Sequence, residues 1–226
     1  MEEIKDNPKW SLGAIVTTFG LKRLLWGLQS MPLLEKWVAA EGDLTEAEGL
    51  RLEQLRKRLL TQADNWNEEE LKMYFVAFVL EIVGYLDEEN PYHAFFEQSI
   101  TATINQYKLS SKPDMLLAKG VEDELYTPYL CFHEYTCTER SRSEKSKPDK
   151  DPRAQLIIDM LIAQSLNHNG KPIYGCYVAG KFWSFVVLDN KELMISKEFD
   201  ATKTKDLHKF IFILRHFWVI LRELLG

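Results

Sequence analysis

Apolar residues recur with a helical period from Leu21 to about Asn90. They are grouped in runs whose members are three or four positions apart, which is the spacing that places side chains on one face of a helix. The pattern predicts two or three antiparallel helices. The runs cover residues 21–28, 50–60 and 71–86.

Short polar signals mark where these helices begin and where the helical region ends. Thr45 and Glu48 have the spacing of a capping box, and Asn67 is followed by three acidic residues that would lie at the positive end of a helix. The polar stretch 87–91 includes a proline and interrupts the period. We therefore predict a helical extension over residues 1–90.

Beyond that boundary, after a short helical piece predicted at residues 93–98, apolar and polar residues alternate as they do in β-strands. A turn is expected at residues 110–113, and residues 138–150 contain no apolar side chain other than a proline, which predicts a loop. The three strands are expected at residues 100–109, 114–118 and 129–137.

The last part of the chain alternates between helix and strand signals. Asp151 and Pro152 are the residues expected at a helix start, and the following helix is apolar on nearly every side, so it should be buried. Residues 172–178 and 182–188 predict a hairpin, and an amphipathic helix is expected from Asp206. The fold class is therefore α/β, with a core domain over residues 91–226.

Composition is consistent with a globular protein of one domain with an extension. The 226 residues are 46% hydrophobic, and three cysteines without CxxC spacing favour reduced thiols. The first residues lack the basic and apolar regions of a secretion signal. Charged residues interrupt the apolar runs at 74–86 and 210–221, which predicts buried helices and no membrane span. We expect a cytoplasmic protein.

Charge is distributed unevenly along the chain, whose net charge is −6. Residues 1–98 carry 10 basic and 18 acidic side chains, whereas residues 99–226 carry 18 basic and 16 acidic ones. A protein that coats nucleic acid usually has a basic surface, so only the second part is suited to contact phosphate. The acidic extension is a candidate surface for a protein partner.

Two carboxylates are the strongest chemical signal in the sequence. Asp114 follows a proline, and Glu134 stands 20 positions later at the end of an apolar strand. An aspartate after proline can simply close a turn, but a glutamate in an apolar strand needs a metal, a cationic partner or an edge position. Carboxylate oxygens are the preferred protein ligands of Mg²⁺, so the pair predicts a site for Mg²⁺ or Mn²⁺.

The proline, the two acids and their setting on neighbouring strands resemble the PD-(D/E)XK nuclease superfamily over residues 97–188. Residues 172–188 resemble an uncharacterised bacterial branch of it. The resemblance implies a restriction-endonuclease-like core, in which helices flank a mixed central sheet. It also implies metal-dependent hydrolysis of phosphodiester bonds, with Asp114 and Glu134 as metal ligands.

The resemblance implies roles for three further positions. Glu97 matches an acidic residue that many members add to the metal site, and Gln155 matches a glutamine that helps to orient the active site. Thr136 stands where the family has a lysine. Losing one well-placed electrostatic group commonly lowers a rate by roughly 100-fold to 1000-fold, so catalysis could be weakened. The candidate replacements for this lysine are Lys119, Lys171 and Arg153.

Two other classes of function remain open at this point. The chain could be a catalytically inactive nuclease fold that binds a protein partner through its acidic extension, or it could bind DNA or RNA without cleaving it. A zinc site at Cys131, His133 and Cys137 is disfavoured, because residues two and four apart on one strand are spread too far for a tetrahedron.

Overall fold

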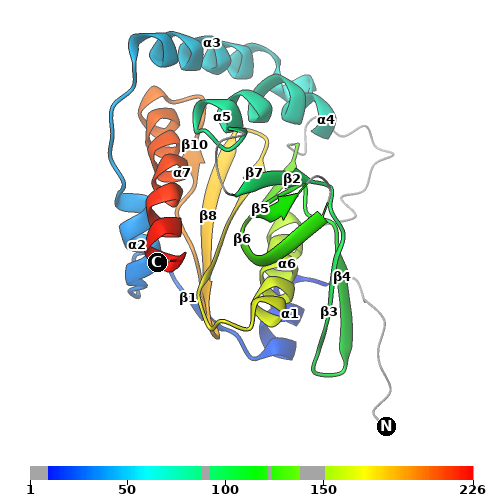
Figure 1. Cartoon of the computed structure of the whole chain (residues 1–226). Coiled ribbons are helices and arrows are strands. Elements are labelled where there is room, and N and C mark those ends of the chain that lie inside the picture. The colour runs from blue at the N-terminus through cyan, green and yellow to red at the C-terminus, as the bar shows by residue number, and fades with distance from the viewer. Residues whose placement is uncertain (1–9, 88–91, 122–123, 138–150, 226) are drawn as a thin grey trace.

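The computed structural model describes residues 10–87, 92–121, 124–137 and 151–225. Within them, a mixed eight-stranded sheet is flanked by helices on both faces (Figure 1). The predicted α/β class, with helices flanking a mixed sheet, is confirmed.

The sheet is antiparallel except at two strand pairs. Its order is β1-β9-β8-β7-β6-β5-β2, and β10 pairs with β8 beside this path. The pairs β1/β9 and β6/β7 are parallel. A separate hairpin is formed by β3 and β4. The strand bounds are β1 Lys22–Leu24, β2 His93–Phe96, β3 Ile100–Ile104, β4 Tyr107–Ser111, β5 Met115–Val121, β6 Glu124–Thr136, β7 Ile173–Ala179, β8 Phe182–Asp189, β9 Glu192–Ile195 and β10 Phe199–Asp200.

The helices cover the two faces of the sheet in two groups. In Figure 1, α2 and α7 lie against one face, and α6 with α1 and the β3–β4 hairpin lies against the other. A 3₁₀ turn, η1, and a π-helical turn, η2, adjoin α3 and α4. The bounds are α1 Leu12–Phe19, α2 Pro32–Ala39, α3 Glu46–Gln62, η1 Ala63–Asn65, α4 Glu68–Leu71, η2 Lys72–Val76, α5 Ala77–Ile82, α6 Pro152–Asn167 and α7 Thr204–Leu225.

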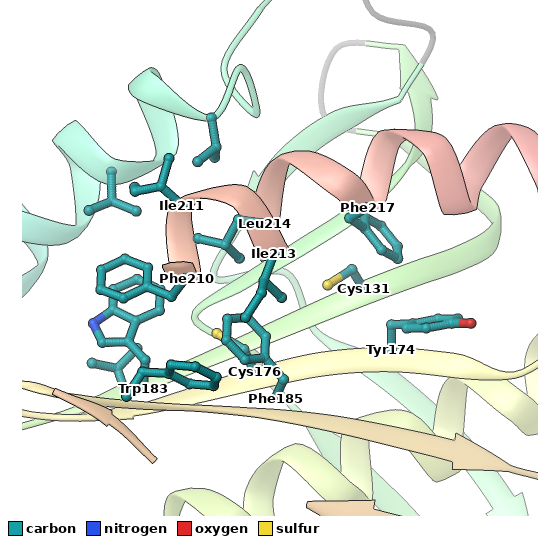
Figure 2. Close-up of a cluster of buried hydrophobic side chains, with 14 of the residues drawn as sticks. Cys131, Tyr174, Cys176, Trp183, Phe185, Phe210, Ile211, Ile213, Leu214 and Phe217 are labelled. Carbon is teal, nitrogen blue, oxygen red and sulfur yellow. The ribbon is translucent and has the colours of Figure 1, made fainter. Parts of the chain in front are cut away.

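The α7 face of the sheet is an aromatic core (Figure 2). The ring of Phe210 on α7 stacks on Trp183 of β8, with ring centroids 4.5 Å apart and an interplanar angle of 6°. Trp37 of α2 packs its ring edge-on against Phe185 and donates from its indole nitrogen to the backbone oxygen of Ile213 at 2.7 Å. Burying such rings with their polar atom satisfied fixes α2 and α7 on the sheet.

The opposite face is packed by α6, as the continuous apolar pattern of this helix predicts. Asp151 caps its start by accepting from the backbone nitrogen of Arg153 at 3.0 Å. Gly175 of β7 allows a close approach to the helix, since a Cβ there would lie 2.9 Å from Leu156 Cδ1. α6 is therefore held directly over β6 and β7, which is the position from which it contributes to the candidate site.

Several helix signals are confirmed in the N-terminal region, but the helix predicted at residues 21–28 is wrong. The predicted capping box at Thr45 is present, and Asn67 begins a helix with acids in its first turn, where it also forms a capping box with Glu70. The first helix instead ends before Gly20, whose φ of 62° breaks it. The next residues form β1 and pair with β9, and Leu28 is 80% exposed. Pairing with a distant strand therefore overrides the local helical period.

Two predictions near residue 100 are also wrong. Residues 93–98 are not helical, because His93–Phe96 pairs with β5 at the edge of the sheet. The single strand predicted at residues 100–109 is a two-stranded hairpin that turns at Asn105, whose φ is 55°. Asparagine tolerates this conformation without a glycine signal, and the alternation continues through both arms.

One hydrophobic cluster contains residues from both predicted domains. Trp37, Leu55 and Phe75 share it with Phe185 and Phe217. The predicted boundary, near residue 90, and the predicted loop at 138–150 lie outside the described residues. The division into an extension and a core therefore stays a prediction. No helix in the described part of the chain is long and apolar enough to cross a membrane.

Candidate functional site

Asp114 and Glu134 come together at the junction of β5 and β6. Asp114 directly precedes β5, and the antiparallel register that pairs Met115 with His133 places Asp114 opposite Glu134. Both residues are buried, with exposed fractions of 9% and 3%. The structure thus brings together the two acids that the sequence singled out.

The nearest cation to Asp114 is Lys72, which the sequence did not indicate. Lys72 is the first residue of η2, and its Nζ lies 2.6 Å from Asp114 Oδ1. The other carboxylate oxygen, Oδ2, accepts a hydrogen bond from the backbone nitrogen of Tyr135 at 2.7 Å. Lys72 Nζ is also 3.0 Å from Glu68 Oε1 and 3.6 Å from Glu97 Oε1, so one ammonium group serves several acids.

Burial and charge act against each other at this ion pair. Burial raises the pKa of Asp114 above its usual range, against the lowering effects of Lys72 and of the Tyr135 backbone N–H. Burial alone would lower the pKa of Lys72, but its hydrogen bonds to Asp114 and Glu68 outweigh that effect and raise it. Lys72 therefore stays protonated, and the short contact is a partly buried ion pair.

Glu134 faces a second buried acid, Asp159 of α6, which the sequence analysis missed. Asp159 is fully buried, and its carboxyl group is close enough to Glu134 to repel its negative charge. Burial, followed by repulsion from Asp159 and Asp114, raises the pKa of Glu134 well above its usual range. Glu134 Oε1 has no hydrogen-bond partner among the described residues. The signal in the sequence was an aspartate inside an otherwise apolar helix.

Glu97 lies beside this cluster, although not on a helix as expected. It follows β2 with a φ of 55° and is about half exposed. Its Oε2 is 2.8 Å from Lys112 Nζ, and this contact lowers the pKa of Glu97. Glu97 and Asp114 are both ion-paired with Lys72. Glu97 therefore borders the site from the solvent side.

Thr136 and Gln155 lie on the two elements that carry Glu134 and Asp159. Thr136 is the last residue of β6, and its backbone oxygen accepts from Gly180 at 2.7 Å. Gln155 is half-buried on α6, one helical turn before Asp159. The role of Gln155 in orienting the active site, and of position 136 in stabilising charge, stay predictions.

Two of the three basic residues considered as replacements for the missing lysine contact residues outside the acidic pair. Lys119 lies over the ring of Tyr92 at 5.4 Å, and Arg153 pairs with Asp151 at 2.9 Å. Lys171 is in the segment before β7. The cation placed against Asp114 is instead Lys72, from the helical region.

The carboxylate oxygens are suitable donors for a hard divalent cation, but no complete ligand group is assembled. No set of three or more His, Cys, Asp or Glu side chains in the described ranges is arranged to hold a metal. The unpartnered Oε1 of Glu134 fits an Mg²⁺ or Mn²⁺ ligand, whereas Oδ1 of Asp114 is bound to the Lys72 ammonium. His133 is hydrogen-bonded to Tyr135 through Nδ1 at 2.9 Å.

Comparison of the sequence with models of known protein families and with curated proteins found no match. The fold and the site define an α/β protein with a buried acidic cluster at the junction of two central strands.

Proposed function

We propose that the chain is a metal-dependent, nuclease-like protein that hydrolyses phosphodiester bonds of DNA or RNA. The order of its elements supports a restriction-endonuclease-like core. After α5, the strands β2, β5 and β6 form an antiparallel set, interrupted only by the β3–β4 hairpin, and α6 then leads to β7, which is parallel to β6. This order of helix, three strands, helix and strand supports such a core, with α5 as the first helix and β2 as the first strand in place of the predicted residues 93–98 and 100–109.

The observation that carries the proposal is the buried pair Asp114 and Glu134 on neighbouring strands. Burying carboxylates close together is unfavourable unless a cation neutralises them, and Glu134 retains an oxygen without a hydrogen bond within the described residues. A divalent cation bound there would neutralise phosphate charge and lower the pKa of an attacking water. Asp114 and Glu134 would hold this cation.

The surrounding residues would have supporting roles. Asp159 would add negative charge beside Glu134 that favours a bound cation, and Gln155, on the same face of α6, would orient a water or a substrate oxygen. Glu97 would act at the border of the site. Thr136 supplies a hydroxyl and no charge, so we expect slow hydrolysis.

A second function is favoured by the ion pair of Lys72. A short contact between Lys72 Nζ and Asp114 Oδ1 already supplies positive charge at the site, and position 136 offers none. A catalytically inactive nuclease fold that binds nucleic acid or a protein partner would also have these features.

Calorimetric titration with Mn²⁺ and Mg²⁺ tests the proposal. We expect the full chain to bind, and Asp114→Asn and Glu134→Gln each to lower the affinity at least tenfold. Glu124→Gln is the matched control, because Glu124 is an exposed acid on the same strand as Glu134. Absence of binding to the wild-type chain, or equal loss in the control, would contradict the metal site.

Cleavage is measured separately on plasmid DNA and on single-stranded RNA. We expect hydrolysis that requires Mn²⁺ or Mg²⁺ and is lost in Asp114→Asn. Nucleic-acid binding without hydrolysis, insensitive to Asp114→Asn, would support the inactive alternative instead.

A further inference from the structure

We infer that Lys72 is an internal competitor for the divalent cation, so that the metal must displace its ammonium group from Asp114. This inference rests on the proposed function. It assigns Lys72 an inhibitory contact rather than a purely structural one.

The contact occupies the carboxylate oxygen that a metal would need. Lys72 Nζ is 2.6 Å from Asp114 Oδ1, and the Tyr135 backbone N–H already binds Oδ2 at 2.7 Å. Mg²⁺ requires oxygen ligands at about 2.0–2.1 Å in a near-octahedral arrangement. An ammonium group in contact with Oδ1 would repel a divalent cation and obstruct its approach, so the two compete for Asp114.

Lys72 has other partners that make its displacement feasible. Its Nζ lies 3.0 Å from Glu68 Oε1, 3.5 Å from Glu69 Oε1 and 3.6 Å from Glu97 Oε1. A lysine side chain is flexible, and its ammonium is a compact charge that can move between nearby carboxylates. Lys72 can therefore leave Asp114 and remain paired.

The local backbone is also unusual at this position. Lys72 begins the π-helical turn η2 directly after the four-residue helix α4. π-helical turns within α-helices are rare overall, but those that occur are often found at functional sites. Here the turn follows the acids Glu68 and Glu69, so the cation and two of its three alternative partners belong to one continuous segment.

Calorimetric titration of the full chain with Mn²⁺ distinguishes competition from a structural role. We expect Lys72→Met to bind Mn²⁺ at least tenfold more tightly than the wild type. Lys112→Met is the control, because Lys112 pairs with Glu97 and its removal changes the net charge by the same amount. Its affinity should stay within threefold of the wild type.

A second variant covers the case in which Lys72→Met fails to fold. Lys72→Gln keeps a neutral hydrogen-bond donor for Asp114, and we expect it also to bind more tightly than the wild type. In parallel, thermal melts with and without Mn²⁺ should show a larger metal-induced increase of Tm in each Lys72 variant than in the wild type.

The possible results separate this inference from the function on which it rests. Equal affinities of the wild type and both Lys72 variants would overturn the inference and leave the metal site standing. Binding by the Lys72 variants alone would support the inference and overturn metal use by the wild-type chain. No binding by any of them would overturn the metal site, and the inference with it.

Discussion

The ion pair between Lys72 and Asp114 should contribute much more to stability than an ion pair on the surface. The side chains are only 18% and 10% exposed. Exposed pairs contribute about 0.2–1 kcal/mol, whereas removing one partner of a buried pair costs about 3–5 kcal/mol. Because Lys72 is partly exposed, we expect Lys72→Met to lower the free energy of unfolding by about 2–3 kcal/mol.

Asp114→Asn should be less damaging, since Lys72 keeps Glu68 and the new amide oxygen can still accept from Tyr135. We expect a loss of about 1 kcal/mol, and a double variant that is less destabilised than the sum of the two single changes. Urea unfolding followed by circular dichroism, at pH 7.5 with EDTA, measures all four corners of this cycle.

The matched control is Lys22→Met. Lys22 forms an ion pair of 2.7 Å with Glu192, but these side chains are 65% and 47% exposed. Lys22→Met should lower the free energy of unfolding by less than about 1 kcal/mol. The reasoning would be refuted if Lys72→Met cost no more than Lys22→Met, or if the losses from Lys72→Met and Asp114→Asn were simply additive.

Three further predictions concern a buried histidine, the packing of α6 on the sheet and an ion pair between α7 and α3. Burial lowers the pKa of His133 from 6.5 to about 3, so the neutral imidazole contributes stability above pH 6.5 that is lost as the pH falls. Urea unfolding should show that the free energy of unfolding decreases by about 2 kcal/mol between pH 7 and pH 5 for this reason. This decrease should be absent in His133→Gln. Gly175→Ala should destabilise by about 1–3 kcal/mol in the same assay, because its Cβ would meet Leu156, and a neutral result would contradict the close packing of α6. Arg215→Met should lower stability by about 1–3 kcal/mol, since Arg215 pairs with Glu48, and thermal unfolding unchanged by the substitution would disprove this role.

The sequence predicts elements whose signals are local and continuous. The helix from Pro152 and the hairpin of β7 and β8 have long apolar patterns and clear end signals, and they occur close to the predicted bounds. The leucines of residues 21–28 have the spacing of one helix face, yet Lys22–Leu24 forms β1. Pairing with β9 decides that conformation, and no local pattern reports a partner so distant in the chain.

The candidate site shows the same difference between local and distant information. Asp114 was found because it follows a proline at the start of an apolar strand, and Glu134 because it interrupts the next apolar strand along the chain. Asp159 carried a weaker signal, as one acid within a buried helix. Lys72 carried none, because a lysine after acids on a helix is typical of a solvated surface. Only the fold places it against Asp114.

The position of Lys72 gives the acidic N-terminal region a chemical connection to the central strands. Lys72 forms ion pairs with Glu68 and Glu69 of this region and with Asp114 before β5. The same region contributes Trp37 to the aromatic core. The helical region is therefore part of this site, because it supplies the cation at Asp114 and part of the packing behind the sheet. The affinity of the Lys72 variants for Mn²⁺ distinguishes a lysine that competes with a metal ion for Asp114 from one that takes the place of the metal.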